Sequence, residues 1–173
     1  MAQKQDLGVF NFAIRAEKDG MNFYMKAAKK FSGNEDLKKL FVSLAKEEAK
    51  HMDIFLEFKA KAEGKGIDQC LKNPDIDTYL EAIVQEGLFP KGDTVNKRLE
   101  KVDTVAQAAA IAMAAEKNAI LLYTELAKLA KDKDQKKFFE KIVKEEKSHL
   151  VMVADLRADN DPMYAALRFG RFF

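Results

Sequence analysis

Glu47–His51 reads EEAKH and has a near copy, EEKSH, at Glu145–His149 in the second half of the chain. In both copies a Glu and a His stand three residues apart, which places them one turn apart on the same face of a helix. Both side chains can then reach one point in space, as metal ligands must. The chain has two histidines, and each of them closes one copy of this motif.

The repeat extends to the segment that precedes each copy. Ala16–Tyr24 reads AEKDGMNFY and Ala115–Tyr123 reads AEKNAILLY, so each half of the chain adds a Glu that is followed two turns later by a Tyr. A repeat of this length predicts a duplicated structural unit. We therefore expect two helical hairpins, each carrying one lone Glu and one Glu-x-x-His.

The composition predicts a single globular domain over residues 1–173. Of the 173 residues, 47% are hydrophobic and 34% are charged, which allows a sizeable core and is too apolar for a disordered chain. The formal net charge is +2, from 30 basic and 28 acidic residues mixed along the sequence. No block of one sign is available to bind nucleic acid or an anionic membrane, so neither partner is expected.

The expected compartment is the cytoplasm. The longest apolar run, Ala108–Ala115, is far shorter than the roughly 20 residues of a membrane-spanning helix, and the polar start of the chain lacks the core of a signal peptide. The single Cys70 excludes a disulfide framework and a four-Cys metal site, and it is interpreted as an ordinary loop thiol.

Apolar residues recur in steps of three and four over four long segments, which predicts an all-α fold. We expect helices at about 5–31, 34–62 and 103–131, and a fourth from the 131–134 turn to about 159. A long crossover at about 64–103, with a short helix from Pro74 to Gly87, joins the hairpins of this four-helix bundle. The aromatic tail at about 160–173 is expected to dock on its own bundle or on a sister subunit rather than act as a recognition peptide.

The positions of the four core glutamates relative to the turns predict that they meet. Glu17 and Glu48 are equally far from the first expected turn, and Glu116 and Glu146 are equally far from the second. Each lies about 15 residues, or roughly 22 Å, from its turn, so all four fall in one layer of an antiparallel bundle.

Such a layer predicts a metal centre. Buried carboxylates without a counter-charge cost several kcal/mol each, and two divalent cations neutralise the four negative charges. Ligands rich in carboxylate, with two imidazoles and no thiolate, suit iron, with manganese as a second possibility. The six candidate ligands are Glu17, Glu48, His51, Glu116, Glu146 and His149.

Two further features have more than one interpretation. Tyr24 and Tyr123 lie on the ligand stripes, where they either pack in the core or donate a hydrogen bond to a ligand carboxylate. Val9, Phe12 and Phe23 form an apolar line beside the main stripe of the first helix, which needs cover from the crossover or from a second subunit. We therefore expect a homodimer or another small homo-oligomer.

The paired Glu and Glu-x-x-His motifs resemble those of the ferritin-like di-iron carboxylate proteins. The doubled Glu-Glu-x-x-His form, together with the Glu-Lys segments at Glu17–Tyr24 and Glu116–Tyr123, is most similar to the rubrerythrin branch. The resemblance covers the four helices. It implies that Glu48 and Glu146 bridge two irons, that Glu17 and His51 complete one iron, and that Glu116 and His149 complete the other.

The chain departs from these relatives in three ways. Full rubrerythrins carry a four-Cys rubredoxin domain, which this sequence lacks, and they have an extra Glu on the third helix where Met113 and Ala119 stand here. Bacterioferritins place a haem-binding Met after the first bridging Glu, where this chain has Ala49, so no haem is expected.

The leading hypothesis is therefore a non-haem di-iron enzyme, an oxidoreductase of peroxidase or ferroxidase type. Its reduced site would react with O₂ or hydrogen peroxide, and a separate protein such as a rubredoxin-type carrier would supply the electrons. The alternatives are an iron-binding or storage-related protein with ferroxidase chemistry and, less favoured, a structural bundle whose tail recruits a partner.

Overall fold

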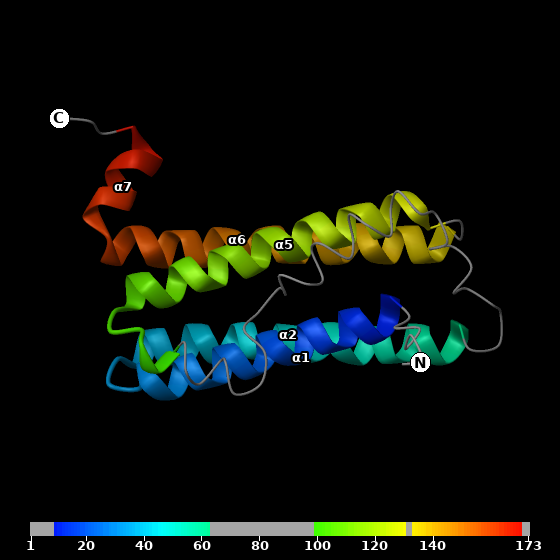
Figure 1. The fold of residues 1–173 in the computed structure, drawn as a ribbon, viewed down its shortest axis with the longest axis horizontal. Coiled ribbons are helices and arrows are strands. Elements are labelled where there is room, and N and C mark those ends of the chain that lie inside the picture. Colours follow the sequence, from blue (N-terminus) through cyan, green and yellow to red (C-terminus); the bar gives the residue numbers. More distant parts are fainter. Residues whose placement is uncertain (1–8, 63–98, 131–132, 171–173) are drawn as a thin grey trace, which may run out of the picture.

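A computed structural model describes residues 9–62, 99–130 and 133–170, which form helices and contain no strand (Figure 1). The helices are α1 (Val9–Lys30), α2 (Glu35–Ala62), α5 (Val105–Leu129), α6 (Lys133–Asn160) and α7 (Pro162–Phe169). The predicted all-α bundle of two hairpins is confirmed. Most of the expected crossover, with its short helix and Cys70, lies outside the described residues, as do residues 1–8 and the last three residues of the tail.

The first hairpin turns where the sequence predicts it. The Asn34 side-chain oxygen accepts hydrogen bonds from the backbone N–H groups of Asp36 and Leu37 at 3.0 and 3.1 Å, which caps the start of α2. Lys29 and Lys30 place positive charge in the last turn of α1, at the negative end of the helix dipole, which stabilises that end of the helix. The chain therefore reverses within a few residues, and α1 and α2 pack side by side.

The second hairpin begins with a capping box at the start of α5. The Thr104 hydroxyl accepts from the Gln107 N–H at 3.2 Å, and the Gln107 side chain accepts from the Thr104 N–H at 3.2 Å. Buried small residues then line α5, which allows close packing against α6; they are Ala108, Ala109, Ala112, Ala115 and Ala119.

Within the described residues, α5 is the one helix whose length and apolar composition would allow it to cross a membrane. The same properties characterise the central helix of a bundle, and α5 carries the fully buried Glu116 at its middle. These features are those of a helix that packs one face on the core of the bundle.

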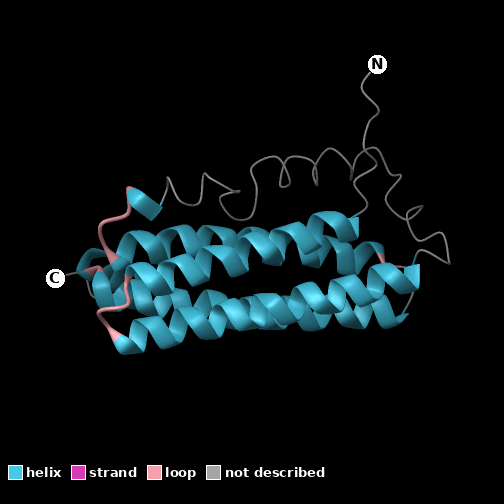
Figure 2. Cartoon of the chain, turned by 90° about the horizontal axis from the view of Figure 1, so that it is seen from below, coloured by secondary structure: helices cyan, strands magenta, loops and turns pink. Residues whose placement is uncertain are grey.

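The two hairpins lie against each other and enclose a common core (Figures 1 and 2). Aromatic rings fill the core on the side of the α5–α6 turn, where Phe55 stands 5.1 Å from Phe138 and Phe58 stacks on Phe138 at 4.3 Å between ring centroids. On the other side Tyr24 stacks on Phe41 at 6.3 Å. These rings pack on both sides of the polar layer at the middle of the bundle.

The tail forms a helix, α7, which leaves the end of the bundle at an angle (Figure 1). Its start has the Asp161 carboxylate as N-cap, accepting from the Tyr164 N–H at 3.0 Å, and Pro162 in the first turn. Arg157 of α6 covers the Tyr164 ring at 4.3 Å, and Arg168 of α7 pairs with Asp155 of α6 at 2.7 Å. One face of α7 therefore contacts α6, and the sequence analysis does not predict this helix.

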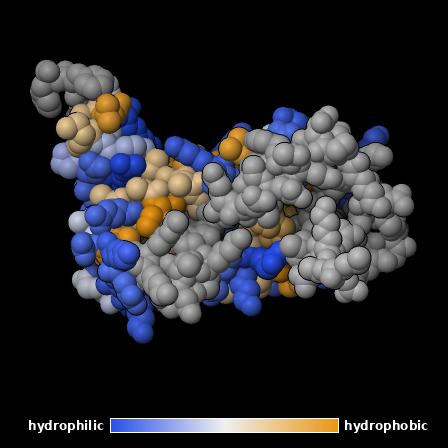
Figure 3. Space-filling view, viewed as in Figure 1, coloured by the Kyte–Doolittle hydropathy of each residue, from blue (hydrophilic) through white to orange (hydrophobic). Residues whose placement is uncertain are grey.

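The outer face of α7 is apolar and open to solvent. Met163, Leu167 and Phe169 are 72%, 58% and 59% exposed, and Figure 3 shows hydrophobic atoms on this projecting end of the molecule. The described part of the tail thus packs only partly on its own bundle.

Candidate metal centre

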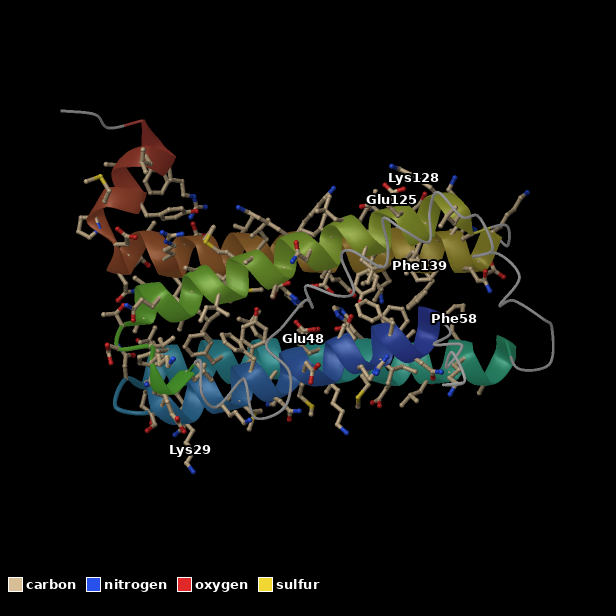
Figure 4. All side chains as sticks on the ribbon, viewed as in Figure 1. Lys29, Glu48, Phe58, Glu125, Lys128 and Phe139 are labelled. Atoms are coloured by element: carbon tan, nitrogen blue, oxygen red, sulfur yellow. The ribbon has the colours of Figure 1, made fainter. Side chains whose placement is uncertain are left out.

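All six sequence-predicted residues lie in one buried layer between the two hairpins. Each side chain comes from near the middle of its helix, and Figure 4 shows Glu48 at the centre of the bundle. None of the six residues is more than 3% exposed. The layer draws on α1, α2, α5 and α6 as the hairpin geometry predicts: Glu17, Glu48, His51, Glu116, Glu146 and His149.

The layer divides into two overlapping sets of four residues whose potential ligand atoms lie within 4.8 Å of one another. One set adds Glu17 and His51 to a shared pair, and the other adds Glu116 and His149 to the same pair. The shared pair is Glu48 and Glu146, one from each hairpin. Two overlapping sets of potential ligands with two common carboxylates are therefore built into the bundle.

The distances show that the carboxylate of Glu146 lies between the two imidazoles. His51 Nδ1 lies 3.0 Å from Glu146 Oε1 and 3.5 Å from Glu17 Oε2. His149 Nδ1 lies 3.3 Å from Glu146 Oε2 and 3.5 Å from Glu48 Oε1. The two oxygens of Glu146 thus face different imidazoles, whose rings stack 5.6 Å apart.

The inward-facing atoms fit a pair of cations because they lack partners of their own. Among the described residues, five buried atoms of this layer have no hydrogen-bond donor or acceptor: Oε1 of Glu48 and Glu146, Oε2 of Glu116, and Nδ1 of His51 and His149. Buried polar atoms are nearly always satisfied, so a cluster of five unsatisfied lone-pair atoms calls for a cation between them.

Without metal, the layer holds protons in place of cations. Burial, and then the charge of Glu146, raise the pKa values of Glu48 and Glu116 well above the ordinary range. Burial also acts to raise the pKa of Glu146, but the neighbouring imidazoles of His149 and His51 lower it to about 2. Burial likewise opposes a charged His51, yet its contacts with Glu146 and a second carboxylate raise its pKa to about 11. Metal ions would therefore displace protons from this layer.

The Rubrerythrin family model matches residues 9–157. These residues include α1, α2, α5 and all of α6 but its last turn, and they exclude α7. The chain belongs to the Rubrerythrin family. No curated protein and no solved structure matches the chain significantly. Membership agrees with the ferritin-like resemblance of the sequence, and the buried carboxylate and histidine layer fits the di-iron site of this family.

In this rubrerythrin-family chain the two buried tyrosines connect the hairpins. The Tyr24 hydroxyl donates to Glu116 Oε1, and the Tyr123 hydroxyl donates to Glu17 Oε1, so each Tyr bonds the lone Glu of the other hairpin. Of the two interpretations that the sequence leaves open, the hydrogen bond to a candidate ligand is the one observed. The second oxygen of each Glu stays available, and Glu17 Oε2 faces His51.

Burial keeps both phenols protonated. It raises the pKa values of Tyr24 and Tyr123 well above the ordinary range, and the nearby carboxylate charges raise them further. Both hydroxyls therefore act as hydrogen-bond donors, which orients the two lone glutamates before a metal binds.

Glu145 is a residue of the site that the sequence analysis misses. Its Oε2 accepts a hydrogen bond from His51 Nε2 at 3.0 Å, and its Oε1 lies 3.5 Å from the Lys141 ammonium. This bond places a proton on Nε2 and leaves Nδ1 facing the carboxylates of the layer. Its counterpart Glu47 instead pairs with Lys50 of the same helix at 2.7 Å.

Proposed function

We propose that this chain is a non-haem di-iron oxidoreductase whose reduced site reacts with O₂ or hydrogen peroxide. The observation that carries the proposal is the pair of overlapping four-residue sets, which are buried, share two glutamates and have unsatisfied lone pairs facing inward. Four carboxylates balance two divalent cations, and carboxylate with imidazole suits iron, with manganese as the second candidate.

Each metal position has its own residues. Glu17 and His51 would hold one ion, Glu116 and His149 would hold the other, and the shared Glu48 and Glu146 would hold both; this set is supported by the two overlapping groups. When bound, two irons supply the two electrons that reduce a peroxide.

The surrounding residues prepare the layer for that chemistry. Tyr24 and Tyr123 orient the lone glutamates, and Glu145 orients His51. The fully buried Phe41 and Phe55 pack against these tyrosines and help to exclude water, which strengthens electrostatic interactions in the layer.

The proposal includes a separate electron donor, a cytoplasmic location and a small homo-oligomer. The separate donor is part of the proposal because the single Cys of these 173 residues cannot by itself hold a four-Cys iron site. Phe12 and Phe23, two residues of the apolar line on the first helix, are 8% and 0% exposed, so they are already covered within one chain.

Anaerobic titration with ferrous iron tests the metal centre first. About two iron ions should bind per chain, and a variant that lacks both shared glutamates, Glu48→Ala with Glu146→Ala, is the control that should bind none. Binding of one ion or none by the wild-type protein would contradict the proposal.

Rapid mixing of the ferrous protein with peroxide or with O₂ then tests the chemistry. Oxidation should appear as new near-ultraviolet absorption, and peroxide consumption with a supplied reductant should exceed one equivalent. A large cage with a mineral core, detected by light scattering and iron loading far above two ions per chain, would instead favour the storage alternative.

A further inference from the structure

A groove of about 620 Å³ runs along the outer face of the α5–α6 hairpin, and lysines surround it. Figure 4 shows one of them, Lys128, on the outer side of α5, across the molecule from Lys29 of the first hairpin. A single carboxylate, that of Glu140, lines the same groove. The six lysines are Lys128, Lys136, Lys137, Lys141, Lys144 and Lys147.

Most of this charge is not neutralised. Lys128 pairs with Glu125 at 2.7 Å and Lys141 lies 3.5 Å from Glu145. The other four lysines form no ion pair with any residue that the structure describes, and all four are exposed. Like charges one turn apart on a helix repel one another, so the arrangement does not stabilise α6. A concave surface with this charge attracts anionic groups.

The groove is also connected to the metal layer. Lys141, which lines the groove, contacts Glu145, and Glu145 accepts the hydrogen bond of His51 at 3.0 Å. Glu145 is partly exposed, with 36% of its side chain accessible, whereas the His51 side chain is 1% exposed. Two contacts thus lead from the groove to a candidate metal ligand.

We propose that this lysine groove is the docking site of an acidic one-electron carrier protein that reduces the metal pair. The inference rests on the proposed function, and it adds which surface of this chain binds the donor and that the donor is acidic. Two successive encounters deliver two electrons, which together with two protons convert one hydrogen peroxide to two waters. Complementary charge would guide the carrier to the face from which the path to His51 is short.

The lining chemistry favours an acidic protein over other anionic or charged partners. The groove contains no aromatic side chain and no Arg, the residues on which single-stranded nucleic acids stack. Ferrous ions would be repelled, so this face is not their route to the layer.

The test compares matched lysine pairs from the two repeats. Lys137→Glu with Lys144→Glu changes the groove, and Lys39→Glu with Lys46→Glu changes the equivalent positions of the first hairpin by the same net charge. The probe is a purified acidic rubredoxin, reduced, whose oxidation by the iron-loaded protein and excess peroxide is followed by stopped flow.

At low ionic strength the groove variant should lower the second-order rate constant about tenfold or more, whereas the control pair should change it by less than about twofold. Added salt should remove the difference between the two variants. Equal losses in both variants, or no loss in either, would overturn the assignment of the groove.

Two further measurements separate this proposal from the proposed function. Both variants, reduced chemically, should react with peroxide at the wild-type rate; if the wild-type protein itself fails to react, the oxidoreductase proposal fails. In that case calorimetric titration with oxidised rubredoxin still measures its binding to the protein. Binding that is lost only in the groove variant supports the groove as the docking site. Groove-dependent binding of a labelled single-stranded oligonucleotide without binding of rubredoxin would overturn it.

Discussion

Glu145 accepts the Nε2 hydrogen bond of His51 at 3.0 Å, although the matching Glu47 of the first repeat does not reach His149 and pairs with Lys50 at 2.7 Å. The duplicated site is therefore not symmetric. An anionic acceptor on the far nitrogen fixes the tautomer of a ligand imidazole and makes it a stronger donor. The metal position that includes His51 should differ from its neighbour.

Replacing Glu145 by Gln should weaken one of two metal positions. We expect about a 10- to 100-fold loss of affinity for one ion, as for other hydrogen-bond partners of ligand imidazoles, and little change for the second ion. Anaerobic titration with cobalt, read by its visible spectrum, resolves the two steps. Glu47→Gln is the matched control and should leave both steps as in the wild type; equal effects of the two variants would show that the asymmetry has no influence on binding.

Loss of a bridging tyrosine hydroxyl should destabilise the metal-free protein. Tyr24→Phe leaves Glu116 Oε1 buried without its donor, which costs about 1–3 kcal/mol in the free energy of unfolding. Urea unfolding measures the loss. Tyr164→Phe on α7 keeps its ring over Arg157 and should stay within about 0.5 kcal/mol of the wild type. A Tyr24→Phe variant as stable as this control would argue against the hydrogen bond.

A shared glutamate should matter more for metal content than a lone one. Glu146→Ala removes a carboxylate that belongs to both four-residue sets, whereas Glu17→Ala removes one that belongs to a single set. We expect Glu146→Ala to retain fewer than half of the ions that Glu17→Ala retains after dialysis, by metal analysis. Equal retention would remove the reason for assigning Glu146 a bridging role.

The metal-free protein should become less stable as the pH rises above about 4.5. Glu48 and Glu116 have raised pKa values, so the folded layer keeps protons that the unfolded chain releases above the ordinary carboxyl value of 4.5. His51 acts in the same direction, because its contribution is complete below 6.5 and is lost as the pH rises toward about 11. Glu146, with a pKa of about 2, adds the opposite trend only below 4.5.

Urea unfolding of the metal-free protein at about pH 5 and pH 8 checks this trend. The free energy of unfolding should be lower at the higher pH, and the iron-loaded protein, in which cations replace the protons, should not show that loss. A metal-free protein that gains stability between these two values would contradict the assignment of protons to the layer.

The convergence of the six candidate ligands could be predicted because it depends only on distances along the chain. Once Asn34 ends one turn and the 131–134 segment forms the other, equal spacing brings Glu17 opposite Glu48 and Glu116 opposite Glu146. The hydrogen-bond partners of Tyr24 and Tyr123 could not be predicted, because they belong to the opposite hairpin. The pattern of buried residues on one helix does not say how far one hairpin is displaced along the other.

The role of Glu145 could not be predicted because it depends on one substitution between the repeats. Lys50 holds Glu47 within its own helix, whereas the equivalent Ser148 donates to the Lys144 carbonyl at 3.2 Å and leaves Glu145 able to reach His51. The lysine groove could not be predicted for a related reason. Its lysines alternate with acidic and apolar residues in the sequence, and they come together only when α6 forms and packs against α5.

The sharing of ligands between hairpins sets the order of events as the chain matures. Each four-residue set draws on both halves, so a chain with one folded hairpin offers three of the six residues and neither complete set. Docking of the halves must therefore come before either ion is held at full affinity. Iron acquisition becomes a late event in biosynthesis, and a chain whose halves have not joined is one that cannot carry a reactive metal pair.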